Sequence, residues 1–154
     1  MVELVELNRE QYPALLATHQ AAEPHATMGP VQFTSLMEKR EGFAVVKNGV
    51  IIGAVTFSDL SPGQDIIVHA SVHPDHQKRW LNRSVVEKLR SFIFDELELP
   101  RVTGYMIQGL TVHTGPLLLA LGFRQEGHLR QAIRINGQPY DLILFGLLKA
   151  EWRF

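Results

Sequence analysis

The stretch that decides the fold is "DIIVHASVHPDHQKRWLNRS", residues 65–84. Its first part, residues 65–72, is apolar on both faces, which is typical of a central strand covered on each side. A proline turn follows, in which Lys78 and Arg79 flank Trp80, and an apolar helical pattern comes after it. A helix that begins after such a strand presents unpaired N–H groups and partial positive charge, so the turn is a candidate anion site. A solvated basic turn is the alternative, but ligand sites in α/β folds tend to follow central strands.

The segments on either side alternate between strand and helix patterns. Asn48-Gly49 between two β-rich runs predicts a type I′ hairpin turn, and Asn136-Gly137 predicts a second hairpin. The expected strands are 2–7, two runs within 43–57, 65–72, 101–107, 129–135 and 140–148. The expected helices are 8–19, a short one through Phe33, Leu36 and Met37, 80–97 and 111–121. This order predicts an α/β fold in one domain, residues 1–154, with a mixed central sheet of about seven strands flanked by about four helices.

The composition excludes several classes of function. The net charge is −1, so no global basic field is present to attract nucleic acid, and an anion site must be a local cluster. The chain has no cysteine, which excludes disulfides and thiolate chemistry. No apolar run reaches the roughly 18 residues of a membrane span, and the N-terminus does not read as a signal peptide. We therefore expect a cytoplasmic protein without membrane or nucleic-acid partners.

Two blocks of sequence resemble one enzyme superfamily. The element order, with V-x-P-x-x-Q at 72–77 opening the long helix, resembles the Gcn5-related N-acetyltransferase (GNAT) superfamily. The superfamily signature Q/R-x-x-G-x-G/A reads here as QKRWLN, residues 77–82. The block 117–152, through its LGF-x-x-EG-x-LR, NG…D and EW elements, resembles the branch that acetylates ribosomal-protein N-termini. The resemblance covers nearly the whole chain and extends to phage-type members that look similar, with Trp at the position of Trp80.

The resemblance implies a site for acetyl-coenzyme A as co-substrate. In that family the coenzyme lies between two parallel strands, which implies that the backbone of Ala70 and Val72 binds the pantetheine arm. The N–H groups of the following loop hold the pyrophosphate. The loop residues that the resemblance implies are Gln77, Lys78, Arg79, Trp80, Leu81 and Asn82. Gln77, Lys78, Arg79 and Arg83 would add hydrogen-bond donors and charge.

The loop departs from the superfamily pattern at Trp80 and Asn82, where glycines are usual. Backbone N–H donors survive such a substitution, and glycine is needed only where φ is positive or the ligand passes where Cβ would sit. We interpret Trp80 as part of a working variant loop, in which its ring points away and packs on the adenine or the protein surface. The alternatives are that the ring fills the coenzyme groove, or that it simply plugs into the core at the start of the helix.

Catalytic side chains are less evident than the binding loop. Ile66 stands where many members have a glutamate base, and the adjacent Asp65 points to the other face. Leu118 stands where many members have a tyrosine that protonates the leaving thiolate. Thr114 matches a serine of the ribosomal-protein branch and could hydrogen-bond the coenzyme sulfur; a residue that caps N–H groups near Thr111 is the alternative. Transfer without an obvious base remains feasible, because positioning and backbone N–H groups supply much of the rate.

The sequence thus predicts an N-acetyltransferase that moves an acetyl group from acetyl-coenzyme A to a primary amine, either a protein N-terminus or a small amine. The alternative is a catalytically inactive binding module with the same fold. No metal is expected, because metal sites need three or four converging ligands and a proline turn separates His73 from His76. Trp152 and Phe154 read as packing aromatics, with an edge or homodimer contact as the alternative.

Overall fold

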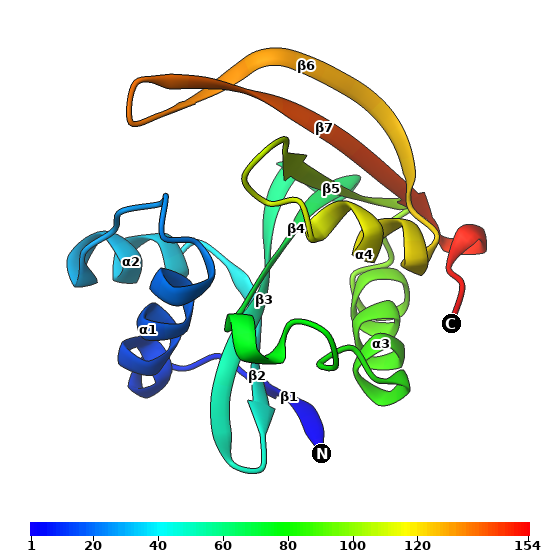
Figure 1. Ribbon diagram of the computed structural model, residues 1–154. Helices are drawn as coiled ribbons and strands as arrows, with labels where there is room; N and C mark the ends of the chain where they lie inside the picture. Colours follow the sequence, from blue (N-terminus) through cyan, green and yellow to red (C-terminus); the bar gives the residue numbers. More distant parts are fainter. The chain divides into compact units, whose positions relative to one another are not determined.

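A computed structural model describes residues 1–154, and the chain divides into two compact units. The first contains residues 1–58 and 68–89, and the second contains residues 59–67 and 90–154. Seven strands form one mixed sheet in the order β1-β2-β3-β4-β5-β7-β6, and four α-helices accompany them (Figure 1). The predicted α/β class with a seven-stranded mixed sheet and four helices is therefore confirmed.

The first unit is built around an antiparallel β1-β2-β3 arrangement. Its elements are β1 (Val2–Glu6), α1 (Tyr12–Ala22), α2 (Pro30–Met37), β2 (Glu41–Lys47), most of β3 (Val50–Ser61), the end of β4 (Asp65–Val72) and most of α3 (Arg83–Arg90). The turn between β2 and β3 has φ of 50° at Asn48 and 80° at Gly49, as the type I′ prediction requires. Leu15 of α1 and Phe33 of α2 pack with Ala44 of β2 in one hydrophobic core. Burial of these apolar faces holds α1 and α2 against the strands.

The second unit is dominated by a long C-terminal hairpin. Its elements are the start of β4, a π-helical turn (Ser91–Glu96), β5 (Arg101–Ile107), α4 (Thr114–Leu121), β6 (Arg124–Ile135) and β7 (Gln138–Leu148). β4 pairs with β5 in parallel at Ile67 and Thr103, and β7 lies antiparallel to both β5 and β6. The predicted strand 129–135 in fact begins at Arg124, because residues after the αL cap at Gly122 (φ 106°) pair directly with β7.

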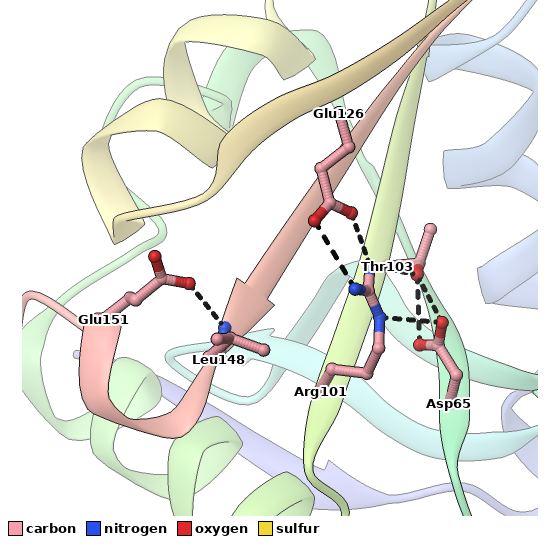
Figure 2. A network of polar contacts seen from close by, with 6 residues as sticks. All are labelled: Asp65, Arg101, Thr103, Glu126, Leu148 and Glu151. Carbon is pink, nitrogen blue, oxygen red and sulfur yellow. Dashed lines mark hydrogen bonds and ion pairs between the residues drawn. The ribbon is translucent and has the colours of Figure 1, made fainter.

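A polar network ties the start of β4 to β5 and β6 in the second unit (Figure 2). The guanidinium of Arg101 donates to Asp65 (Nε to Oδ2, 3.0 Å) and to Glu126, and the hydroxyl of Thr103 donates to Asp65 at 2.8 Å. The hydrogen bond to Glu126 raises the pKa of Arg101 and outweighs burial, which lowers it; the charge of Asp65 raises it further. Asp65 is thus committed to an ion pair with Arg101.

The helix predicted to begin at Trp80 begins instead at Arg83. The side-chain oxygen of Asn82 accepts a hydrogen bond from the Val85 N–H at 2.8 Å, which is the geometry of a helix N-cap. Residues before it form a short 3₁₀ turn, Pro74–His76, and an irregular loop. None of the helices is both long enough and apolar enough to cross a membrane.

Candidate functional site

The strand-to-helix turn of the first unit is anchored at both ends by hydrogen bonds. At its start, the His73 N–H donates to the Ile52 carbonyl at 2.8 Å. The Gln77 side-chain amide donates to the Val72 carbonyl at 3.1 Å. At its end, the Asn82 side-chain amide donates to the Val2 carbonyl at 3.0 Å. Gln77 and Asn82 therefore shape the loop through their side chains, and their backbone N–H groups also donate within the turn, to the carbonyls of Pro74 and Trp80.

A run of backbone N–H groups in this turn has no partner within the protein. The N–H groups of Arg79 and Asn82 donate to carbonyls of the turn itself. Those of Trp80, Leu81, Arg83 and Ser84 donate no hydrogen bond within the protein. Four unpaired donors at the start of a helix are an anion-binding arrangement, and none of them requires glycine.

The Trp80 side chain is buried, with 4% of its surface exposed. It lines a cavity of about 360 Å³ together with Val2 of β1 and Ile52 of β3. The indole thus packs against the first unit's own strands. The ring is therefore turned into the protein interior.

Positive charge gathers around the same turn. The exposed side chains of Lys78 and Arg79 line the Trp80 cavity, and Lys47 from the end of β2 lines it as well. Arg83 differs, because its Nε is paired with Oε1 of Glu87 on the same helix at 2.9 Å. Lys78 and Arg79 are therefore the cations best placed to meet an anion at the turn.

The other predicted site residues lie on regular elements. Ala70 and Val72 sit at the end of β4, with Ala70 exposed and Val72 buried. Thr114 is the first residue of α4, half-buried, and its hydroxyl makes no hydrogen bond within the protein. The hydroxyl of Thr111, by contrast, accepts from the Ile107 N–H at 2.7 Å, at the end of β5. Thr114 is therefore not occupied as a capping residue.

The superfamily's usual catalytic positions hold buried apolar side chains. Ile66 and Leu118 are each 5% exposed. Leu118 packs against Gly104 of β5, where any added Cβ would lie 3.0 Å from its Cδ2. Neither position can supply a proton-transfer group.

The structure shows a polar cluster in the first unit that the sequence did not predict. The Ser58 hydroxyl lies 2.8 Å from Nε2 of His69 on β4. Burial, and then the charge of Arg40, lower the pKa of His69 to about 4, so its imidazole is neutral near pH 7. The i,i+4 spacing of His19 and Glu23 is the one signal that could have pointed to the rest of the cluster.

Glu23 joins this cluster to β4. Nδ1 of His19 lies 3.0 Å from Oε2 of Glu23 and 3.3 Å from the hydroxyl of Ser71, and that hydroxyl also donates to Glu23. Burial alone would raise the pKa of Glu23, but the hydrogen bond from His19 and the charges of His19 and His25 lower it below its usual value. The carboxylate is therefore ionised at neutral pH.

Two curated proteins of Bacillus subtilis (strain 168) are similar to this chain in sequence. "Uncharacterized N-acetyltransferase YoaA" is 34% identical over 106 residues, covering 64% of this chain and 56% of that protein. "Putative ribosomal N-acetyltransferase YdaF" is 37% identical over 65 residues, covering 42% of this chain and 35% of that protein. The chain therefore spans about half the length of the first relative and about a third of the second. No family model matches the chain.

Solved structures show the same fold over the whole chain. The ribosomal-protein-S18-alanine N-acetyltransferase from Escherichia coli superposes with a TM-score of 0.73 at 22% identity, covering 96% of this chain and 94% of that one. The fold is that of the GNAT acetyltransferases, and the resemblance predicted from the sequence is confirmed. Both curated relatives carry names of N-acetyltransferases.

Proposed function

We propose that this protein transfers an acetyl group from acetyl-coenzyme A to a primary amine, either a protein N-terminus or a small amine. The observation that carries the proposal is the turn after β4, where Trp80, Leu81, Arg83 and Ser84 present unpaired N–H groups beside the cations Lys78 and Arg79. Similarity to N-acetyltransferases supports the same reaction. Among possible acceptors, the N-termini of ribosomal proteins are favoured by two names. One is that of the sequence relative YdaF, and the other is that of the structural neighbour, the ribosomal-protein-S18-alanine N-acetyltransferase.

In the proposed reaction the coenzyme is held by backbone groups. The main chain of β4 at Ala70 and Val72 would bind the pantetheine arm. The unpaired N–H groups of the turn and helix start, those of Trp80, Leu81, Arg83 and Ser84, would bind the pyrophosphate. Such contacts position the thioester for attack, and positioning alone supplies a large part of the rate of many transfers.

The chemical step is nucleophilic acyl substitution. The neutral amine nitrogen attacks the thioester carbonyl carbon and forms a tetrahedral intermediate. The C–S bond then breaks, the amine nitrogen loses a proton to water, and the departing sulfur gains one. An α-amine with a pKa near 7.7–8.0 is partly neutral at physiological pH, so it needs little help in losing its ammonium proton before it attacks. We propose that the free hydroxyl of Thr114 donates a hydrogen bond to the departing sulfur.

Removing the two cations of the turn should weaken coenzyme binding selectively. In a Lys78→Ala/Arg79→Ala double variant, which removes two charge-assisted interactions, the affinity for coenzyme A should fall by about 10²- to 10⁴-fold, and dephospho-coenzyme A should lose clearly less. The reason is that charge-assisted hydrogen bonds to the ribose 3′-phosphate contribute roughly 1.5–3 kcal/mol each. Calorimetric titration of both ligands into both proteins measures the difference.

A double variant Arg9→Ala/Lys39→Ala is the matched control, because it removes two exposed cations from the same unit without touching the turn. Its affinities should stay within about twofold of wild type. Equal losses for coenzyme A and its dephospho form would place Lys78 and Arg79 away from the 3′-phosphate. A wild type that binds neither ligand would refute the coenzyme site itself.

A further inference from the structure

A second cavity lies between the end of α1 and the start of α2 in the first unit. Its volume is about 560 Å³, which falls within the range of small-molecule sites. Gln20, Glu23, Met28, Gly29 and Gln32 are among the residues that line it. The coenzyme turn contributes no residue to this cavity.

The walls of the cavity are held in place by the protein itself. The side-chain amide of Gln20 donates to the Met28 carbonyl at 3.3 Å. The side-chain oxygen of Gln32 accepts from the Gly29 N–H at 3.1 Å. Pro30 then begins α2, where its fixed φ suits a first helical residue. The loop is thus ordered before any ligand enters, which lowers the entropic cost of binding.

Glu23 is the only ionisable residue that lines this cavity. Its carboxylate is fixed by His19 and by the hydroxyl of Ser71, which lies on β4 between Ala70 and Val72. The other lining side chains are neutral, so the carboxylate of Glu23, which lies beside His19, is the one charged group in the wall of the cavity. Such a site favours a cationic ligand.

The reacting amine of an acetyl acceptor is a poor occupant of that position. An ammonium group beside a carboxylate holds its proton more firmly, since an opposite charge stabilises the charged form. Attack on a thioester requires the neutral amine instead. The cation that Glu23 suits is therefore a different group of the acceptor.

We propose that this cavity binds a second cationic group of the acceptor, and that Glu23 makes the protein select primary amines that carry another positive charge. The proposal rests on the proposed acetyl transfer, because the bound amine is an acceptor only if that reaction takes place. The required chemistry is found in small diamines and in peptides with a basic side chain next to the N-terminus. Because Glu23 contacts β4 through Ser71, the second charge would be held against the strand proposed to bind the pantetheine arm.

The test compares dicationic with monocationic amines. The probes are 1,4-diaminobutane against n-butylamine, and Ala-Lys amide against Ala-Leu amide, each titrated calorimetrically into the protein saturated with coenzyme A. Steady-state transfer from acetyl-coenzyme A is measured for the same amines. Wild type should bind at least one dication about 10- to 100-fold more tightly than its monocationic partner, the range of one charge-assisted hydrogen bond. A larger ratio of dication to monocation affinity for the diaminobutane pair would indicate a small amine as the source of the second charge. A larger ratio for the dipeptide pair would indicate a peptide.

Glu23→Gln should abolish this preference and leave the monocations within about twofold of wild type. Its effect in kinetics should fall on KM for the dication, with kcat little changed, because binding is lost and not chemistry. Glu23→Asp should keep part of the preference, because the shorter side chain keeps the negative charge but holds it farther from the ligand. Glu10→Gln removes an exposed carboxylate from the same unit and should change nothing.

Two outcomes would overturn the inference. One is a Glu23→Gln variant that binds the dications as wild type does while it remains folded and binds coenzyme A. The other is an equal loss for monocations and dications, which would place the reacting amine itself beside Glu23. A protein that binds dications through Glu23 but transfers no acetyl group would refute the proposed function and keep the cation site.

Discussion

Replacing Trp80 by glycine should lower the free energy of unfolding by about 3–5 kcal/mol, the usual effect of removing a buried tryptophan. The same change should alter the affinity for coenzyme A by less than about tenfold, roughly 1.4 kcal/mol. The two effects separate because the indole is buried in the interior with Val2 and Ile52 around its cavity, whereas the ligand would use the backbone N–H groups. Glycine keeps those N–H groups and adds only loop freedom.

Urea unfolding measures the first effect and calorimetric titration measures the second. Trp152→Gly is the control, because Trp152 packs edge-on against Phe94 in the second unit, with ring centroids 6.1 Å apart. It should cost stability without any change in the coenzyme site. If wild type binds no coenzyme and Trp80→Gly binds it at micromolar concentration, then Trp80 plugs a dead groove and our interpretation of the loop is wrong.

Protonation of His69 should lower the free energy of unfolding by about 3 kcal/mol as the pH drops from 6.5 to 4, in addition to any loss from other groups. Its pKa is lowered from 6.5 to about 4 by burial and by the charge of Arg40, with Glu23 acting in the opposite direction. Between these two pH values the unfolded chain binds a proton at this histidine and the folded protein does not, so acid favours unfolding. Each pKa unit corresponds to 1.36 kcal/mol, which sets the size of the effect.

Denaturant unfolding at a series of pH values measures this loss. His69→Gln should remove most of the pH-dependent part between pH 6.5 and 4, although its stability near pH 7 is expected to be lower than that of wild type. His113→Gln replaces an exposed histidine and should leave the profile as it is. An unchanged pH profile in His69→Gln would show that the imidazole is not held neutral in the folded protein.

The parts of the fold that could be predicted are those with local causes. Asn48-Gly49 and Asn136-Gly137 specify their own turns, because both central residues of a type I′ turn need positive φ. The strand of residues 65–72 and the α/β order follow from apolar patterns of a single segment. The residues at which helices begin were harder to predict. Trp80 and Leu81 fit the helical spacing of the following segment, but Asn82 caps the helix and leaves both outside it.

The parts of the site that escaped prediction depend on contacts between distant segments. The Nζ of Lys88 donates to the Leu4 carbonyl at 3.0 Å, although the two residues are far apart in the sequence. Glu23 acquires its role from Ser71, which is far away in sequence, and nothing in the loop 21–30 reveals that contact. The direction of the Trp80 ring likewise depends on β1 and β3. Such pairings need the register of the sheet, which a single sequence does not contain.

The most direct test of the central claim is release of free coenzyme A thiol when the wild-type protein is mixed with acetyl-coenzyme A and a primary amine. We predict thiol release in proportion to the enzyme, with a matching amount of acetylated amine by mass spectrometry, and no release with the corresponding tertiary amine. The primary amines should include Ala-Lys amide and 1,4-diaminobutane, so that both proposed acceptor classes are covered. Binding of acetyl-coenzyme A with no thiol release and no acetylated product for any of them would contradict the account and identify an inactive binding module with the acetyltransferase fold.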